Sequence, residues 1–374
     1  MNKETKEYWK PIIRYVIYLI LVLGLTLLAY ILTIGNKSSS ILQILRNADV
    51  LFIFIILLIV IACILFRSLA IFFLTRIYAK KYPFYRAIAI DQIGTLYRMI
   101  TPAGVGGHVS ELIFYRKQNI SISNALSVLV MYSIVYQVVL IIFNIITLIV
   151  KGPLIGEIGA ISITFSISGP LNIPLWLLVS IGFVINLSVI GFIFLLSYWN
   201  GFYNFIHGPI AKLLNKIHIV KNLESFQIRL DASRDNFRNN LKALFKHVPT
   251  LIMTALCFVI YIMLSYSVPY FCGLALNSQS SNANFIDSIF LSNFHQMITC
   301  IIPLPGNALT SELFFLKLFY PTNGPKFYQS EEIARTALLL WRSLMFIIPL
   351  FISCLYALIY RPRKRVSYEQ NKEY

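Results

Sequence analysis

Ionisable residues inside otherwise apolar parts of the chain are the first candidates for chemistry. A charge in an apolar surrounding is costly, so each one needs a partner or a function. Two short segments and two neighbouring apolar runs hold these residues. They are Asp91, Arg98, His108 and Glu111 in the first segment, Asp287, His295 and Glu312 in the second, and Arg67 and Arg342 in the runs.

Each short segment is interrupted by proline and glycine, at residues 101–107 and 303–306. Proline ends a helix and glycine lets the chain reverse, so each break predicts two half-length helices. A half-helix that starts near Gly106, and another near Asn307, would point free N–H groups at the break. Such an end favours an anion, for instance a lipid phosphate. The alternative is that the breaks only allow close helix packing. The candidate binding residues here are Gly104, Gly106, Gly107, Gly306 and Asn307.

The arginines and glutamates near the breaks have two interpretations each. Arg67, Arg98 and Arg342 can hold a phosphate in bidentate fashion, or they can form ion pairs that fix helix packing. We expect Glu111 and Glu312 in the first turns of the second half-helices, where a carboxylate caps the helix. Alternatively they pair with Arg67 and Arg342 or with a cationic headgroup. His108 is a candidate ligand residue or a structural histidine.

Motifs of common enzymes are absent from the sequence. It has no Walker loop, HExxH, GxSxG or kinase motif and no Cys/His metal spacing. We therefore predict no catalytic residue, no metal and no cofactor. A rival hypothesis is a lipid or polyprenyl-phosphate transferase that uses Asp49 or Glu312.

The composition is that of a membrane protein. Of 374 residues, 58% are hydrophobic and 13% are charged, whereas soluble domains carry about 25% charged residues. The net charge of +17 lies between the apolar runs. This pattern favours cytoplasmic loops over nucleic-acid binding, so no nucleic-acid partner is expected.

Six apolar runs are long enough to span a bilayer as helices. They cover residues 15–34, 50–74, 125–150, 175–196, 248–272 and 337–360. The stretches 87–114 and 286–319 are two half-length helices each, and we predict that both are re-entrant hairpins. The predicted fold is therefore an all-α polytopic membrane protein of six spanning helices and two opposed re-entrant hairpins, about eight membrane segments.

The charge pattern sets the expected orientation and suggests a repeat. Basic residues concentrate in the N-terminal tail, in the loops near residues 76–86 and 198–247, and in the C-terminal tail. The positive-inside rule then places both termini in the cytoplasm, in the inner or plasma membrane. A shift of 201 positions brings Pro102 onto Pro303 and Glu111 onto Glu312. We thus expect one transmembrane domain, 1–374, with inverted halves 12–150 and 172–360.

The loop 198–247 interrupts the second half and has helical periodicity. Phe237, Leu241, Leu244 and Phe245 share one face, while the opposite face is basic. We expect a cytoplasmic amphipathic linker that lies on anionic headgroups of the inner leaflet. A solvated linker helix is the alternative.

The residues around the first break resemble a known family. Residues 101–107 with Ser110, Glu111 and Arg116, and the second break at 303–306 followed by Glu312, are similar to the transmembrane region of lysylphosphatidylglycerol synthases. These include multiple-peptide-resistance-factor proteins and their stand-alone flippase-like relatives. The likeness covers residues 10–360. It departs at Asn307 and Ala308, where glycines are expected. Because the given sequence stops at Tyr374, we expect no soluble transferase domain and no synthase activity.

The resemblance implies an inner-membrane protein that moves a lipid between leaflets, in the type case aminoacylated phosphatidylglycerol. We therefore predict a lipid flippase-like protein whose partner is a membrane phospholipid, expected to be anionic. Two alternatives remain: the transferase, and a non-transporting partner of a separate lipid synthase. A homo-oligomer is a further candidate assembly.

Overall fold

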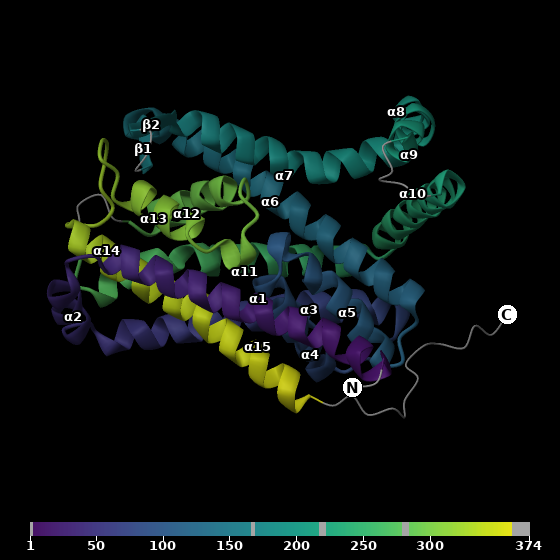
Figure 1. The fold of residues 1–374 in the computed structure, drawn as a ribbon, viewed down its shortest axis with the longest axis horizontal. Helices are drawn as coiled ribbons and strands as arrows, with labels where there is room; N and C mark the ends of the chain where they lie inside the picture. Colours follow the sequence, from purple (N-terminus) through teal and green to yellow (C-terminus); the bar gives the residue numbers. More distant parts are fainter. Residues whose placement is uncertain (1–2, 166–168, 217–221, 279–283, 361–374) are drawn as a thin grey trace.

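The computed structural model describes residues 3–165, 169–216, 222–278 and 284–360, and it is built almost entirely of helices (Figure 1). Within these ranges, five helical segments are long and apolar enough to cross a membrane. They are α1 (Lys3–Ile34), α3 (Val50–Tyr78), α6 (Ile122–Ile158), α11 (Val248–Ala275), and the continuous run of α14 (Glu331–Arg342), the π-helical turn η4 (Ser343–Ile347) and α15 (Ile348–Ile359). The predicted all-α polytopic membrane fold is confirmed.

The sixth predicted span is also helical and forms α7 (Leu175–Tyr198). It is not among the five spans because its described apolar part is shorter, Leu175–Ser188. Two small elements were not predicted. One is α2 (Ser38–Arg46), and the other is an antiparallel hairpin of β1 (Ala160–Phe165) and β2 (Gly169–Pro174) between α6 and α7. Apolar and polar residues alternate from Ile161 to Thr164, which is a pattern typical of a strand. This stretch is too short and too polar to stand out as an apolar run.

Both predicted breaks separate two packed helices. The first unit is α4 (Phe84–Ile100), the short turn η1 (Pro102–Gly104) and α5 (Val105–Lys117). The second is α12 (Phe285–Thr299), η3 (Pro305–Asn307) and α13 (Thr310–Phe319). In each unit the second helix folds back onto the first. Figure 1 shows the two units toward opposite ends of the long axis. Their re-entry into a membrane and the inverted repeat remain predictions.

The core runs along the pair α3 and α11, which pack against each other. Ile56 and Ile71 of α3 and Phe258 and Ile262 of α11 are almost fully buried. Helix α15 packs on α4, and α12 packs on α6 and α7. Each broken unit is therefore packed against long helices through its first helix, and such packing helps an interrupted helix in an apolar solvent.

Polar contacts hold α1 and Lys37, which follows it, to the last span α14–η4–α15. Lys37 lies 2.7 Å from Glu332 and 3.2 Å from Glu331. These hydrogen bonds, that to Glu332 first, raise the pKa of Lys37 above its usual value. Farther along, the hydroxyl of Tyr30 is 2.7 Å from Oγ of Ser343. Helix α1 is thus fixed against the last span at two levels.

The predicted linker forms α8 (Asn200–Phe205), η2 (Ile206–Ile210), α9 (Ala211–Lys216) and α10 (Leu223–Lys246). Helix α10 buries Phe237, Leu241 and Leu244 as expected. Phe245 does not belong to that face, because its side chain is 65% exposed. The C-terminal basic tail, used above for orientation, lies outside the described residues.

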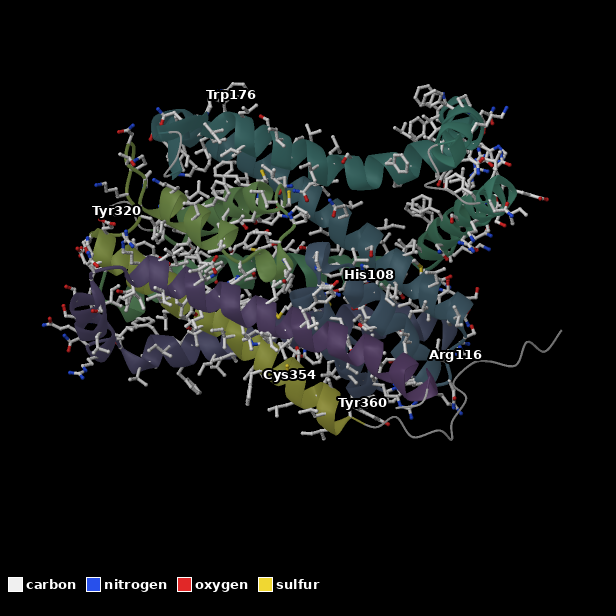
Figure 2. All side chains as sticks on the ribbon, viewed as in Figure 1. His108, Arg116, Trp176, Tyr320, Cys354 and Tyr360 are labelled. Carbon is white, nitrogen blue, oxygen red and sulfur yellow. The ribbon has the colours of Figure 1, made fainter. Side chains whose placement is uncertain are left out.

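Figure 2 shows how labelled residues lie along the long axis. Tyr320 lies toward one end and Arg116 toward the other, with His108 and Tyr360 at similar positions between them. His108 and Arg116 belong to the same helix, α5, so this helix runs from the middle of the molecule to one end. The break that precedes α5 is therefore placed in the interior of the long axis.

Candidate functional site

The first break has a backbone that only particular residues allow. Gly104 has φ of +67°, a conformation that costs L-residues energy. The hydroxyl of Thr101 donates to the carbonyl of Tyr97 at 2.6 Å and accepts from the N–H of Gly106 at 2.9 Å. A Cβ on Gly106 would lie 2.6 Å from the Thr101 methyl group. Thr101 thus caps both helix ends, and Gly106 permits the close approach.

A buried carboxylate joins the two helices of the first unit. Oε1 of Glu111 is 2.7 Å from Nη2 of Arg98, and Oε2 is 2.9 Å from Nδ1 of His108. The side chain of Glu111 is only 2% exposed, whereas those of Arg98 and His108 are 32% and 50% exposed. The buried carboxylate of Glu111 is therefore balanced by Arg98 and His108, whose own side chains are partly exposed.

Two expectations for Glu111 are wrong. It lies in the second turn of α5 and not in the first, so it does not cap the helix. It pairs with Arg98 and not with Arg67, because α5 folds back onto α4 and brings these two residues together. Arg67 instead donates to Oδ2 of Asp91 and to Oγ1 of Thr95, each at 3.0 Å.

In the second unit the predicted pairing of Glu312 with Arg342 is present. Oε1 of Glu312 is 2.7 Å from Nε of Arg342, and both side chains are 5% exposed. The N–H is not aligned for a hydrogen bond, so the contact is a close ion pair without one. Nη2 of Arg342 also donates to the carbonyl of Gly306 at 2.7 Å. Arg342 therefore ties the last span to the second break.

The second half-helix does not begin near Asn307 as expected. Asn307 and Leu309 have φ of +50° and +70°, and α13 begins at Thr310. The expected N–H groups are thus displaced by a turn that the sequence did not indicate. Nε2 of His295 donates to the carbonyl of Ser311 at 2.8 Å, which fixes the first turn of α13.

The two breaks lie against each other. Turn η1 contacts η3, and a Cβ on Gly306 would lie 3.3 Å from the carbonyl oxygen of Met99. Beside this contact lies a cavity of about 540 Å³, the break cavity. From the breaks and their flanking helices it is lined by Arg98, Thr101, Gly104, Gly306, Asn307 and Arg342.

A second cavity of about 700 Å³, the α5–α6 cavity, is more apolar. Its lining includes Arg67, Arg98 and His108, together with Leu129 and Phe237. Arg98 and Tyr261 line both cavities. These two side chains therefore mark the place where the cavities approach each other.

The candidate residues divide among these spaces. Three candidates do not line the break cavity but contact residues that do. Gly106 lies close to Thr101, and Gly107 and Glu111 lie close to Arg98. Glu312 lines a third cavity of about 560 Å³ with Lys317 and Arg335. Several lining residues were not named as candidates from the sequence: Tyr132, Tyr136, Tyr261, Gln296 and Trp341. Their only sequence signal is a polar or aromatic group within an apolar run.

Within the described part of the chain, no group of three or more His, Cys, Asp or Glu residues is placed to hold a metal ion. The structure also places Asp49, the residue named for the rival transferase hypothesis. Asp49 is the N-cap of α3, and its carboxylate accepts from the N–H of Leu51 at 2.8 Å. Asp49 is thus engaged in a structural role.

The fold and the buried ion pairs define a multi-pass helical membrane protein with an interior polar site. The model of the lysylphosphatidylglycerol synthase TM region matches residues 14–353, so the chain belongs to this family. The resemblance seen in the sequence is confirmed over nearly the same range. A comparison with curated proteins gives no match.

Proposed function

We propose that this protein moves a membrane phospholipid from one leaflet to the other. The observation that carries the proposal is the pair of cavities that share Arg98 and Tyr261. One contains both helix breaks and polar side chains, and the other is mostly apolar. A lipid has the same division into headgroup and acyl chains.

The charges of the site suit a headgroup that carries a phosphate. Arg98 uses Nη2 for Glu111, which leaves its other N–H groups for a ligand. A guanidinium binds phosphate through parallel N–H donors. A phosphate that crosses hydrocarbon without such donors would lose its hydration uncompensated. In this proposal Arg98 holds the phosphate at the point where the two cavities meet.

The apolar cavity suits the acyl chains. His108 and Val109 on α5 are each about half exposed, and Leu126 on α6 is 41% exposed. This edge of the cavity would open sideways to the hydrocarbon in a membrane. A lipid could then enter with its tails still in the bilayer, and only its headgroup would have to pass through the protein.

Translocation requires that the break cavity faces one leaflet and then the other. The two broken units lie toward opposite ends of the long axis and touch at η1 and η3. We propose that they are opposed re-entrant hairpins whose relative movement opens the site alternately. Both termini and the basic linker 198–247 are assigned to the cytoplasmic side of the cell membrane, by the positive-inside rule.

The test is lipid movement in proteoliposomes, measured with a fluorescent phospholipid and an impermeant quencher. The protein should raise the rate of movement above that of empty vesicles. R98Q should lower this rate about tenfold or more, because a hydrogen bond to a charged group contributes roughly 1.5–3 kcal/mol. R76Q is the matched control, since Arg76 lies on α3 and outside the linings of the cavities described above. Folded protein that moves no lipid faster than empty vesicles would refute the proposal.

A further inference from the structure

The break cavity has an unequal distribution of charge. The charged side chains that line it are Arg98 and Arg342, and His295 is also present. Among its described lining residues none is acidic. The carboxylates that neutralise the two arginines lie elsewhere: Glu111 is 2% exposed behind Arg98, and Glu312 lines a different cavity.

Arg342 keeps donors for a ligand. Its Nε contacts Glu312 and its Nη2 donates to Gly306, which leaves the two N–H groups of Nη1. The arginine is 4% exposed and held at three points, because its guanidinium also lies 4.0 Å from the ring centroid of Phe346. A fixed guanidinium loses little entropy when it binds an anion.

Two of the aromatic rings that line the cavity already contact arginines. The ring of Phe346 already contacts Arg342, and Tyr261 lies 5.6 Å from the guanidinium of Arg67. Rings attract cations through their faces, and on these two rings an arginine occupies that position. An ammonium group would therefore meet two guanidinium groups without a lining carboxylate to offset them.

One residue of the cavity lining also carries a polar atom that lacks a donor. Oε1 of Gln296 is buried without a hydrogen-bond partner among the described residues. The amide of Asn307 and the hydroxyl of Ser265 lie in the same lining. A phosphate diester ionised at neutral pH has no O–H to give to Gln296, whereas a hydroxyl group does.

We propose that the break cavity binds the headgroup of an anionic lipid that carries a phosphate and a free hydroxyl, a polyol or a sugar, and that it disfavours an aminoacylated headgroup. Arg98 and Arg342 hold the phosphate, and Gln296 accepts from the hydroxyl. The inference rests on the proposed function for the statement that the ligand is a lipid. It differs from the substrate of the type case in the family resemblance.

Lipid preference of the purified full-length protein tests this inference. Native mass spectrometry would compare phosphatidylglycerol with phosphatidylmethanol, which has the same charge without hydroxyls, and with lysylphosphatidylglycerol. We expect phosphatidylglycerol to bind about two- to tenfold more tightly than phosphatidylmethanol, the contribution of one hydrogen bond. Lysylphosphatidylglycerol should bind at least about tenfold more weakly than phosphatidylglycerol, since one uncompensated charge costs this much or more.

Variants assign the preference to residues. Q296L should bring the affinity for phosphatidylglycerol down to that for phosphatidylmethanol and leave the latter unchanged. R342Q should remove the preference for anionic lipid over zwitterionic phosphatidylethanolamine. R335Q, two turns earlier on α14, should keep it, because Arg335 lines the third cavity and not the break cavity. The lipid order in the unaltered protein decides the question even if a variant does not fold.

Three outcomes would overturn the inference. They are tighter binding of lysylphosphatidylglycerol, equal binding of phosphatidylglycerol and phosphatidylmethanol, and soluble glycerol phosphate that binds as tightly as the lipid. The transport assay separates this failure from that of the proposed function. If the protein moves only the lysylated lipid, the headgroup assignment is refuted and lipid translocation stands. If it binds lipid in the expected order but moves none, the headgroup assignment stands and translocation is refuted.

Discussion

Removal of the buried carboxylate of Glu312 should destabilise the protein strongly. Its Oε1 lies 2.7 Å from Nε of Arg342, and each side chain is 5% exposed. In E312Q the guanidinium stays buried, with the carbonyl of Gly306 as its remaining polar contact. Breaking one side of a buried ion pair costs about 3–5 kcal/mol, most of it from the charge left uncompensated. We expect a loss of this size.

A matched pair on the surface gives the comparison. Glu331 and Arg335 on α14 also lie 2.7 Å apart, but their side chains are 41% and 24% exposed. Solvent screens such a pair, so E331Q should cost at most about 1 kcal/mol. E331Q also removes the contact of Glu331 with Lys37 at 3.2 Å. A smaller loss of stability in E331Q than in E312Q would therefore show the effect of burial, although E331Q removes two ion pairs.

The measurement is unfolding of each variant by sodium dodecyl sulfate in mixed micelles, followed by tryptophan fluorescence. The double variant E312L/R342M removes both charges and should recover most of the stability, since an apolar pair avoids desolvation. Equal stability of E312Q and E331Q, or a double variant that is less stable than E312Q, would refute the reasoning.

Three further predictions concern topology and backbone. In a cysteine-free background, a cysteine at Val105 should react with an impermeant reagent from the cytoplasmic side and one at Asn307 from the outside; reaction of both from one side would rule out opposed hairpins. G306A should lower the thermal unfolding temperature, because Gly306 has φ of +60° and a Cβ there would lie 2.5 Å from Cζ of Phe346. A strained alanine costs about 1–2 kcal/mol. An unchanged unfolding temperature would contradict this prediction. A spin label at Phe245 should be shielded from an aqueous relaxation agent in nanodiscs with anionic lipid and less so in neutral ones; equal accessibility would show that α10 is a solvated linker.

The elements of the fold could be predicted because a membrane leaves few choices. Apolar runs of about 20 residues must be helices, since their backbone groups have to be satisfied internally. The breaks at 101–107 and 303–306 were visible for a similar local reason, as proline and glycine interrupt a helix wherever they occur. Helix α2 and the β1–β2 hairpin were missed because short connecting elements carry no long apolar signal.

The partners of the buried charges were only half predictable. Glu312 and Arg342 were paired correctly, but Glu111 was assigned to Arg67 and contacts Arg98. That choice depends on how closely α5 lies on α4. A side chain at Gly94 would overlap Glu111, so this glycine makes room for the carboxylate. Such a contact has no signature in either local sequence.

The sequence by itself therefore determined a polytopic helical membrane protein, two interrupted helices and the ionisable residues near them. These follow from composition and from the local conformational limits of each residue. The tertiary structure decided that the two breaks touch, that two cavities meet at Arg98 and Tyr261, and that the carboxylates lie behind the arginines. The physical reason is that these features arise from packing between different helices, which a local pattern does not encode; the partners are 13 residues apart for Arg98 and Glu111 and about 200 for the two breaks.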